Sequence, residues 1–401
     1  MQPAPQAVAW RNALMAAFLA SGLLLATLVA RLPSLRDELQ LDHASVGLLL
    51  LCLSAGSFLS VSLSGHLVSR LGAANVMRLC AVLAGTSLAL VGISAVLWHL
   101  PWLTGIFLFT QGLGIASWNV ASNVQGAAME RSLGRVVMSM LHGFFSIGTV
   151  LGAGIGAAAA ALQITIAAHY AVMGVLIGAI VLLGSRYFGP DNSRAAHGSG
   201  QGSLGRAWRE PQTILLGVLV LGMALAEGAA GDWVALALAD GYGTTESTGA
   251  LGYAVFVTAM TAMRLLGGDL ILRFGRVVMI RVSAVLALIG LLLFSTGQSL
   301  PVAFAALGLW GIGVALTFPL AMSAASDDPL HAAARVSVVS TIGYGAFLGG
   351  PPLLGLLANQ IGLLPALSSI SLLVVLALVL SSNAAGYPKD TGDSEQSMQG
   401  K

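Results

Sequence analysis

Runs of apolar residues long enough to cross a lipid bilayer follow one another along almost the whole chain. A helix needs about 20 apolar residues to span a hydrocarbon core about 30 Å thick. A soluble domain could not bury twelve such runs in its core, so they predict an all-α membrane protein with twelve transmembrane helices. Their ranges are 10–32, 45–67, 75–97, 101–128, 136–160, 164–187, 212–236, 248–272, 277–298, 301–324, 336–358 and 362–384.

The composition excludes several other classes of protein. Hydrophobic residues make up 57% of the chain and charged residues 8%, with a mean hydropathy of +0.88, so a soluble globule could not bury the apolar surface. No basic cluster with interleaved aromatic residues indicates nucleic acid, and no Cys/His spacing indicates a metal. No phosphate loop indicates a nucleotide-driven pump, and no cofactor is expected. Cys52 and Cys80 lie within apolar runs, where a packing role is favoured over a disulfide.

The distribution of lysine and arginine predicts the orientation of the chain. Of the 18 lysines and arginines, Arg31 and Arg36 would lie on the outer side and Arg264 within the eighth run, which leaves 15 on the inner side. Cytoplasmic loops carry the excess of positive charge in membrane proteins. Both termini are therefore predicted to face the cytoplasm.

An internal repeat divides the sequence into two related halves. Residues 65–72 read G-H-L-V-S-R-L-G and residues 268–275 read G-D-L-I-L-R-F-G, an offset of 203 that keeps both glycines, the leucine and the arginine. Parallel repeats of this kind place a substrate site between two halves that rock to give alternating access. The predicted parts are an N-terminal six-helix bundle over 1–187, a cytoplasmic linker over 188–211, a C-terminal six-helix bundle over 212–386 and a disordered tail over 387–401.

The seventh run carries two acidic residues, Glu227 and Asp232. A carboxylate near the middle of a membrane helix costs about 2.5 to 3.5 kcal/mol and normally faces a bundle interior or a water-filled cavity. Glu227 lies about 24 Å along a helix that begins at Pro211, at 1.5 Å per residue, and Asp232 lies nearer the far surface. Glu227 is therefore a candidate functional residue, and Arg264 on the next, antiparallel helix could reach it as a partner.

The repeated G-x-L-x-x-R-x-G motif is similar to the signature loop of the major facilitator superfamily, and the similarity covers about residues 10–385. It implies the major facilitator fold. Within that superfamily, Asn123-Val124-Gln125, Glu130-Arg131, Arg135 and the H-G-F-F-S-I-G run at 142–148 resemble a bacterial branch related to the fucose:proton symporters. Glu227 with Asp232-Trp233 fits the same branch.

This resemblance implies an inner gate of ion pairs, Arg70 with Glu130 and Arg273 with Asp327 or Asp328, that closes the cytoplasmic side of the outward-facing protein. Exposed pairs are worth only about 0 to 1 kcal/mol, which is sufficient for a gate. Ser69 stands where the motif usually has Asp, which weakens the gate in the first half. Alternatively, these arginines only follow the positive-inside rule and bind lipid headgroups. The gating candidates are Gly65, Arg70, Gly72, Glu130, Arg135, Gly268, Arg273, Gly275, Asp327, Asp328 and Arg335.

The resemblance also implies that the first, fourth, seventh and tenth helices line a central pathway. Amides and carboxylates beside aromatic rings suit a small polyhydroxylated or otherwise polar solute. For Asn123 and Gln125, hydrogen bonds that hold the helix bundle together are an equal alternative. The substrate-binding candidates are Trp118, Asn119, Asn123, Gln125, Glu227, Asp232, Trp233, Thr317 and Phe318.

Proton coupling is predicted to involve Glu227, Asp232, His142 and Arg264. Protonation of Glu227 would remove its charge before the helix reorients, while a fixed ion pair with Arg264 is the alternative role. His142 lies about 10 Å from the inner helix end at Arg135, at the depth expected of Asn123, and is a candidate relay or a packing residue. Asn119 stands where Asp is expected in close relatives, which argues against a proton role there.

The predicted function is secondary transport of a small polar, sugar-like solute in the bacterial inner membrane, driven by proton symport. The partners expected are this solute, protons and the lipid bilayer, for a monomer that binds no nucleic acid. Proton-driven efflux is the first alternative, although Ala153 stands where the similar drug-efflux signature has proline. A membrane sensor that kept a transporter fold is the second alternative. An enzyme is not expected, because no nucleophile and base occur at a suitable spacing.

Overall fold

The computed structural model describes residues 5–133, 137–189, 205–297, 299–327 and 331–385, and most of these residues are helical. Over the described residues, each of the twelve predicted segments is mostly helical, which confirms the fold class. Most of the predicted linker, 190–204, and the predicted tail from 387 onward lie outside the described residues.

The first half runs from α1 to α7. Its third transmembrane segment ends in a π-helical turn, Ser94–Trp98, and its sixth in a 3-10 turn, Ser185–Tyr187. The short helix α2, amphipathic and only eight residues long, was not predicted from the sequence. The helices are α1 Pro5–Ala30, α2 Leu32–Leu39, α3 His43–Leu71, α4 Ala73–Ile93, α5 Pro101–Leu133, α6 Met138–Ala161 and α7 Ile166–Gly184.

The second half runs from α9 to α16. A two-residue turn at Ala315 and Leu316 splits the tenth predicted segment into α12 and α13, and the twelfth is divided into α15 and α16. The helices are α9 Pro211–Leu236, α10 Glu246–Phe274, α11 Arg276–Thr296, α12 Leu300–Val314, α13 Thr317–Ala325, α14 Ala332–Ile361, α15 Leu363–Ser368 and α16 Ser371–Leu380.

Eleven helical stretches of the described chain are long and apolar enough to cross a membrane. The remaining predicted segment is α5, which has 33 residues and is long enough to span. Polar side chains such as Gln111, Asn119, Asn123 and Gln125 lower its hydropathy. The helix that departs most from a simple apolar run is therefore one that carries candidate substrate residues.

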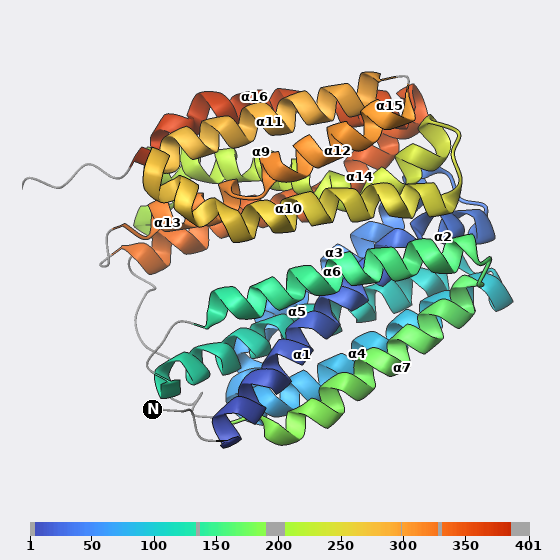
Figure 1. Ribbon diagram of the computed structural model, residues 1–401, viewed down its shortest axis with the longest axis horizontal. Helices are drawn as coiled ribbons and strands as arrows, with labels where there is room; N and C mark the ends of the chain where they lie inside the picture. The colour runs from blue at the N-terminus through green and yellow to red at the C-terminus, as the bar shows by residue number, and fades with distance from the viewer. Residues whose placement is uncertain (1–4, 134–136, 190–204, 298, 328–330, 386–401) are drawn as a thin grey trace, which may run out of the picture.

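The two halves form two layers of roughly parallel helices, coloured blue to green and yellow to red in Figure 1. They pack against each other along α3 with α14 and along α6 with α10. Gly47 of α3 lies so close to the backbone of Pro351 that a Cβ there would be 2.7 Å from the Pro351 carbonyl oxygen. Only a glycine allows this close approach between the halves.

The internal repeat is visible in the backbone and in side-chain contacts. Gly72 and Gly275, the last glycines of the repeated motif, have φ of 81° and 78° between consecutive helices. Arg78 Nε donates to Ser185 Oγ at 2.8 Å, and Arg281 Nε donates to Ser381 Oγ at 3.0 Å. Arg78 and Arg281 are themselves 203 residues apart, so each half ties its third transmembrane segment to its last one in the same way.

We refer to the two ends of the bundle by residues that lie there. The Arg31 end is where α1 ends and α10 begins, near α2 in Figure 1. The Arg70 end is opposite, where α3 ends and α4 begins.

Replacing Gly275 with alanine should lower stability, because a residue with a Cβ is strained at positive φ by about 1 to 2 kcal/mol. Gly268 is the matched control: it lies inside α10 and an added Cβ there would meet nothing within 4 Å. Gly268→Ala should leave stability unchanged or raise it, since alanine favours helix. Thermal unfolding in detergent measures both. Equal melting temperatures for Gly275→Ala and Gly268→Ala would contradict this interpretation of the turn.

Candidate functional site

Glu227, the central acid of α9, forms an ion pair with Arg264 of α10. Arg264 Nη2 donates to Glu227 Oε1 at 2.7 Å, and Arg264 Nε donates to the Ala315 carbonyl oxygen at 3.2 Å. Both side chains stay partly accessible, at 23% for Glu227 and 31% for Arg264. Because Ala315 lies in the turn between α12 and α13, the guanidinium joins three segments of the second half. The pair presents donors and acceptors without a net charge.

The first half contributes amides and an imidazole. His142 Nε2 of α6 lies 3.1 Å from Asn123 Oδ1 of α5, so the two residues share the depth that the sequence predicted. The Phe18 ring meets the His142 ring edge-on, with centroids 5.2 Å apart. Ser21 Oγ donates to Asn119 Oδ1 at 2.7 Å. Within the described residues, the Nδ2 groups of both asparagines have no protein partner and can donate to a ligand.

The polar groups of the two halves lie on neighbouring helices across the interface. Helices α6 and α10 pack together, and the Leu265 side chain would lie 3.5 Å from a Cβ at Gly143. Arg264 is within electrostatic range of His142. We call Asn123, His142, Glu227 and Arg264 the central cluster. It is the place in the described structure where ionisable groups of both halves meet at mid-membrane depth.

Asp232 lies apart from this pair, between α9 and α14. It lines a narrow cavity together with Gly228, Phe347, Gly350 and Pro351. Among the described residues it has neither a hydrogen bond nor an ion pair. Glu227 and Asp232, only five positions apart, therefore occupy different electrostatic environments.

Four of the substrate candidates are packed inside the protein in this conformation. Trp118, Trp233 and Thr317 are fully buried, and Gln125 is 1% exposed. Gln125 Oε1 accepts a hydrogen bond from Trp10 Nε1 of α1 at 3.1 Å. Gln125 thus makes the interhelical hydrogen bond that was the alternative to substrate binding.

Phe318 is partly exposed and begins a row of aromatic rings. Its ring centroid is 6.1 Å from that of Tyr344, which is 6.3 Å from that of Phe347. Tyr344 is 46% exposed. The row follows α13 and α14 and offers ring faces to a ligand, a role that the sequence indicated only for Phe318.

The ion pair between Arg70 and Glu130, which is expected for the outward-facing protein, is not formed in this conformation. Glu130 Oε1 accepts hydrogen bonds from the backbone amides of Val137 and Met138, both at 2.8 Å. These amides lie at the start of α6 and lack helical partners, so the carboxylate caps the helix. Arg70 is exposed at the end of α3. No residue spacing in the sequence indicates that a helix N-terminus takes this carboxylate.

In the second half the expected pair of Arg273 with Asp327 is replaced by Arg276 with Asp327, at 2.7 Å from Nη1 to Oδ1. The turn at Gly275 reverses the chain between the two arginines, and Arg273 lies over the Phe274 ring instead. Asp328 and Arg135 lie outside the described residues. The remaining gating candidate, Arg335, donates from Nε to Glu210 Oε2 at 2.7 Å.

Gly65 and Gly268, the first glycines of the repeated motif, have no neighbour within 4 Å of a Cβ placed on them. Close packing against a neighbouring helix therefore does not account for these two glycines in this conformation. At the Arg70 end the motif helices are exposed rather than pressed against the opposite half.

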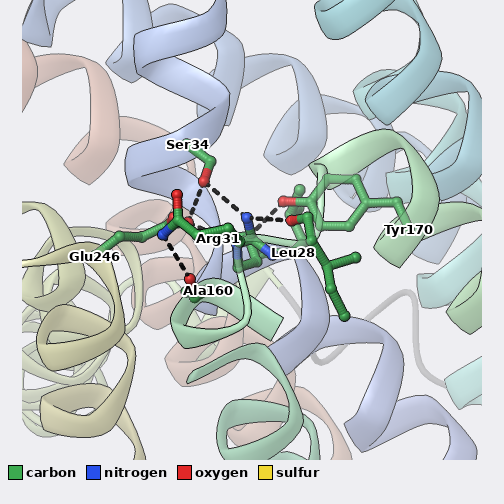
Figure 2. A network of polar contacts seen from close by, with 8 residues as sticks. Leu28, Arg31, Ser34, Ala160, Tyr170 and Glu246 are labelled. Atoms are coloured by element: carbon green, nitrogen blue, oxygen red, sulfur yellow. Dashed lines mark hydrogen bonds and ion pairs between the residues drawn. The ribbon is translucent and has the colours of Figure 1, made fainter. Parts of the chain in front are cut away.

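At the Arg31 end, by contrast, side chains join the two halves. Arg31 Nε donates to Glu246 Oε1 at 2.6 Å, and Ser34 Oγ donates to the same oxygen. Arg31 Nη2 donates to Ser34 Oγ at 3.1 Å and to the Ile164 carbonyl oxygen at 2.9 Å (Figure 2). Tyr170, whose hydroxyl donates to the Leu28 carbonyl at 3.0 Å, lies beside this network. The Arg31 side chain is only 4% exposed, so this pair is largely shielded from solvent.

A second group of contacts lies at the same end. Asp240, in the π-helical turn after α9, accepts from Arg36 Nη1 and lies 3.0 Å from His43 Nε2. Asn359 Nδ2 of α14 donates to Asp42 Oδ2 at 2.6 Å, and Asn359 Oδ1 accepts from the Ala44 amide at 3.2 Å.

None of these residues is among the gating residues predicted from the sequence. The available signal was that Arg31 and Arg36 are the two cations predicted outside, with Asp240 and Glu246 at corresponding helix ends of the other half. In the described part of the chain, the inter-half hydrogen bonds and ion pairs cluster at this end. The protein is thus closed at the Arg31 end.

A metal site has no support among the described residues, where no group of three or more His, Cys, Asp or Glu side chains could hold an ion. The central cluster likewise lacks a nucleophile activated by a base. Its chemistry is hydrogen bonding and charge, which serves to bind and release a solute.

Comparison with known proteins agrees with this architecture. The model of the Major Facilitator Superfamily matches residues 13–351. A transporter of Sinorhizobium fredii (strain NBRC 101917 / NGR234) named y4wD is 36% identical over 377 residues, which are 93% of this chain and 97% of the relative. The nucleoside transporter NupG has a TM-score of 0.74 at 14% identity and covers 96% of this chain and 100% of its own. The E. coli fucose:proton symporter FucP has a TM-score of 0.61 at 18% identity, covering 93% and 98%.

Two related helical halves that meet at a polar cluster, and that are locked at one end by ion pairs, define a multi-pass membrane transporter. The family and its relatives are likewise named as transporters and not as enzymes. The chain belongs to the Major Facilitator Superfamily.

The Glu210–Arg335 pair generates a pH-dependent prediction. The Arg335 guanidinium holds the pKa of Glu210 below its usual value of 4.5, so the pair stabilises the fold above that pH and is lost as pH falls through the lower folded value. Glu210→Gln should cost about 1.5 to 3 kcal/mol at pH 7, the range for hydrogen bonds to charged groups. Below about pH 4.5 the difference in the free energy of unfolding between Glu210→Gln and wild type should become small.

Thermal unfolding in detergent across this pH range measures the effect. Asp269→Asn is the matched control, because Asp269 is exposed on α10 and its loss should leave the melting temperature unchanged. A gap between wild type and Glu210→Gln that stays constant down to pH 3.5 would contradict the role of the ion pair.

Proposed function

We propose that this protein symports a small, neutral, polar solute with protons across the bacterial inner membrane. The solute is sugar-like, and transport proceeds by alternating access at the interface of the two halves. Both termini lie in the cytoplasm, which places the Arg31 end outside and the Arg70 end inside, as the distribution of lysine and arginine supports.

The central cluster carries this proposal. The charges of Glu227 and Arg264 cancel, so the pair favours a ligand without net charge. Around it, the free amide groups of Asn119 and Asn123 donate, the carboxylate accepts, and the aromatic row offers ring faces to C–H groups. This combination matches a compound with several hydroxyl groups on a compact carbon frame.

The structural neighbours support the same class of solute. NupG is a nucleoside transporter and FucP a fucose:proton symporter, and nucleosides and fucose both carry several hydroxyl groups. Proton coupling is assigned to Glu227 and Asp232, with His142 as a relay at the interface. A proton on Glu227 would weaken its pair with Arg264 and free the guanidinium for the solute.

The gating residues at the two ends of the bundle act in different conformations of the transport cycle. In the conformation described here, the Arg31 end is joined by ion pairs while the motif glycines at the Arg70 end are open, which corresponds to an inward-facing protein. In the outward-facing protein the Arg31 end would separate. Gly65, Arg70, Glu130, Arg273 and Asp327 would then approach one another, with their partners exchanged.

Solute-driven proton movement tests the function. Purified protein in proteoliposomes should alkalinise the outside when a sugar or another polyhydroxylated compound from a panel enters the vesicles. Glu227→Gln should abolish this signal, because the amide carries no exchangeable charge and pairs poorly with Arg264. External pH and uptake of labelled solute are recorded together.

Each outcome decides between the candidate functions. Binding of a solute without any flux would identify a sensor, and proton-driven exit would identify an exporter. Flux without proton movement in both wild type and Glu227→Gln would overturn proton coupling while leaving transport in place. His66→Gln serves as a control, because His66 is exposed at the Arg70 end and its replacement should leave proton movement unchanged.

A further inference from the structure

Asp232 is a membrane-embedded carboxyl group without a partner. Its cavity between α9 and α14 is too narrow to hold a water molecule, and Gly228, Phe347 and Pro351 lie on its walls. Neither an ion pair nor a hydrogen bond to Asp232 is found among the described residues. Asp232 is partly accessible, but an ionised carboxylate here would lack both a counter-ion and a protein donor, which is unfavourable within a membrane helix.

Helix α14, across the cavity from Asp232, contains a backbone carbonyl that lacks its helical donor. Pro351 and Pro352 lie inside α14, and neither has an amide hydrogen. The regular helical donor to the Phe347 carbonyl oxygen would be the amide of residue 351, so that oxygen lacks its donor. Phe347 lines the same cavity as Asp232. Interrupted helices that expose backbone carbonyls are where transporters of this kind place their coupling ions.

The other charged and titratable groups near Asp232 do not supply a counter-charge. Glu227, on the same helix, is engaged by Arg264. Tyr253 of α10 is buried and lies within electrostatic range of Asp232, but it carries no positive charge. His43 of α3 lies against the Trp233 ring and is engaged by Asp240. The α14 residues that line the cavity carry no titratable side chain.

We propose that Asp232 binds the coupling proton, and that its O–H group donates to the Phe347 carbonyl oxygen that Pro351 leaves without a donor. The proton is taken up by the carboxylate, and no other bond changes. This inference rests on the proposed proton symport and narrows it, since Glu227 and Arg264 then serve the solute while Asp232 serves the proton.

The position of α14 connects this proton to closure of the Arg31 end. Pro351 faces Asp232 on one side and Gly47 of α3 on the other, so the same turn of α14 contacts both α9 and the opposite half. One turn further, Gly355 packs on the His43 backbone, and Asn359 bonds to Asp42. An ionised Asp232 repels the Phe347 carbonyl and admits water between α9 and α14. Loss of the proton thus loosens α14 and with it the contacts at the Arg31 end.

Distance measurement between the halves tests this inference without a known solute. Nitroxide labels are attached to cysteines placed at Leu162 and Ile361, which are 73% and 50% exposed at the Arg31 end, after replacement of Cys52 and Cys80 by serine. In wild type, raising the pH should shift the label distance from the closed to the open value. One linked proton changes the closed-to-open ratio by up to about tenfold per pH unit.

In the absence of solute, Asp232→Asn should abolish this shift and keep the Arg31 end closed at all pH values, because the amide donates as the protonated acid does. Asp269→Asn, the same acid-to-amide change at an exposed position of α10, should retain the shift. Pro351→Ala restores a helical donor to the Phe347 carbonyl and should weaken the pH dependence, and it gives a second test that does not alter the acid. A pH shift of wild-type size in Asp232→Asn would overturn the inference.

Transport separates this inference from the proposed function. With a transported solute, Asp232→Asn should still exchange labelled for unlabelled solute but fail to accumulate it against a gradient. Suppose that wild type moves no protons with any solute, while its Arg31 end still closes on acidification and this pH dependence is lost in Asp232→Asn. In that case the symport proposal fails and the proton site stands. If Asp232→Asn couples protons to solute as wild type does, the proton site fails and symport stands.

Discussion

The ion pair between Arg31 and Glu246 is the contact on which the observed conformation depends. It joins residues 215 apart in the sequence, from opposite halves, and the Arg31 side chain is almost fully enclosed. Breaking a buried pair by removing one partner costs about 3 to 5 kcal/mol, although the intact pair adds little net stability. Such a contact suits a gate, because it resists partial opening and dissolves once water reaches both charges.

The central cluster lies in the interior between this closed end and the open one. Its ion pair is built within the second half, and the first half supplies the amides and the imidazole. Neither half alone offers the full set of donors and acceptors. A solute bound there would contact both halves, and the free energy of that binding can favour one arrangement of the halves over the other. The inner and outer gates then alternate around a fixed site.

Much of the fold follows from the sequence because it depends on local properties. The length of each apolar run sets the helices, and the repeat at 65–72 and 268–275 sets their division into two halves. The depth of Glu227 and Arg264 in the membrane could be predicted for the same reason, since a rise of 1.5 Å per residue fixes how far each lies along its helix. Helix α2 was missed because it is short and half polar, and thus unlike a transmembrane run.

Contacts that depend on the exact packing of distant segments could not be predicted in this way. The partner of Gln125 is Trp10 of α1, and the partner of Glu130 is a helix N-terminus, two outcomes that no residue spacing distinguishes. Arg276 rather than Arg273 meets Asp327 because Gly275 turns the chain between them. The contacts of Glu246 and Asp240 with the first half span more than half of the chain, so they required the three-dimensional structure.

The most direct test of this account is a reversible cross-link at the Arg31 end. Ala44 and Asn359 lie on opposite halves and are in hydrogen-bond contact, so cysteines at both positions should be joined by a short bifunctional thiol reagent that can be cleaved by reduction. If the halves must separate there in each cycle, cross-linking should arrest solute flux and reduction should restore it. Cross-linked protein that still transports at the uncross-linked rate would show that this end does not open, and would contradict the account.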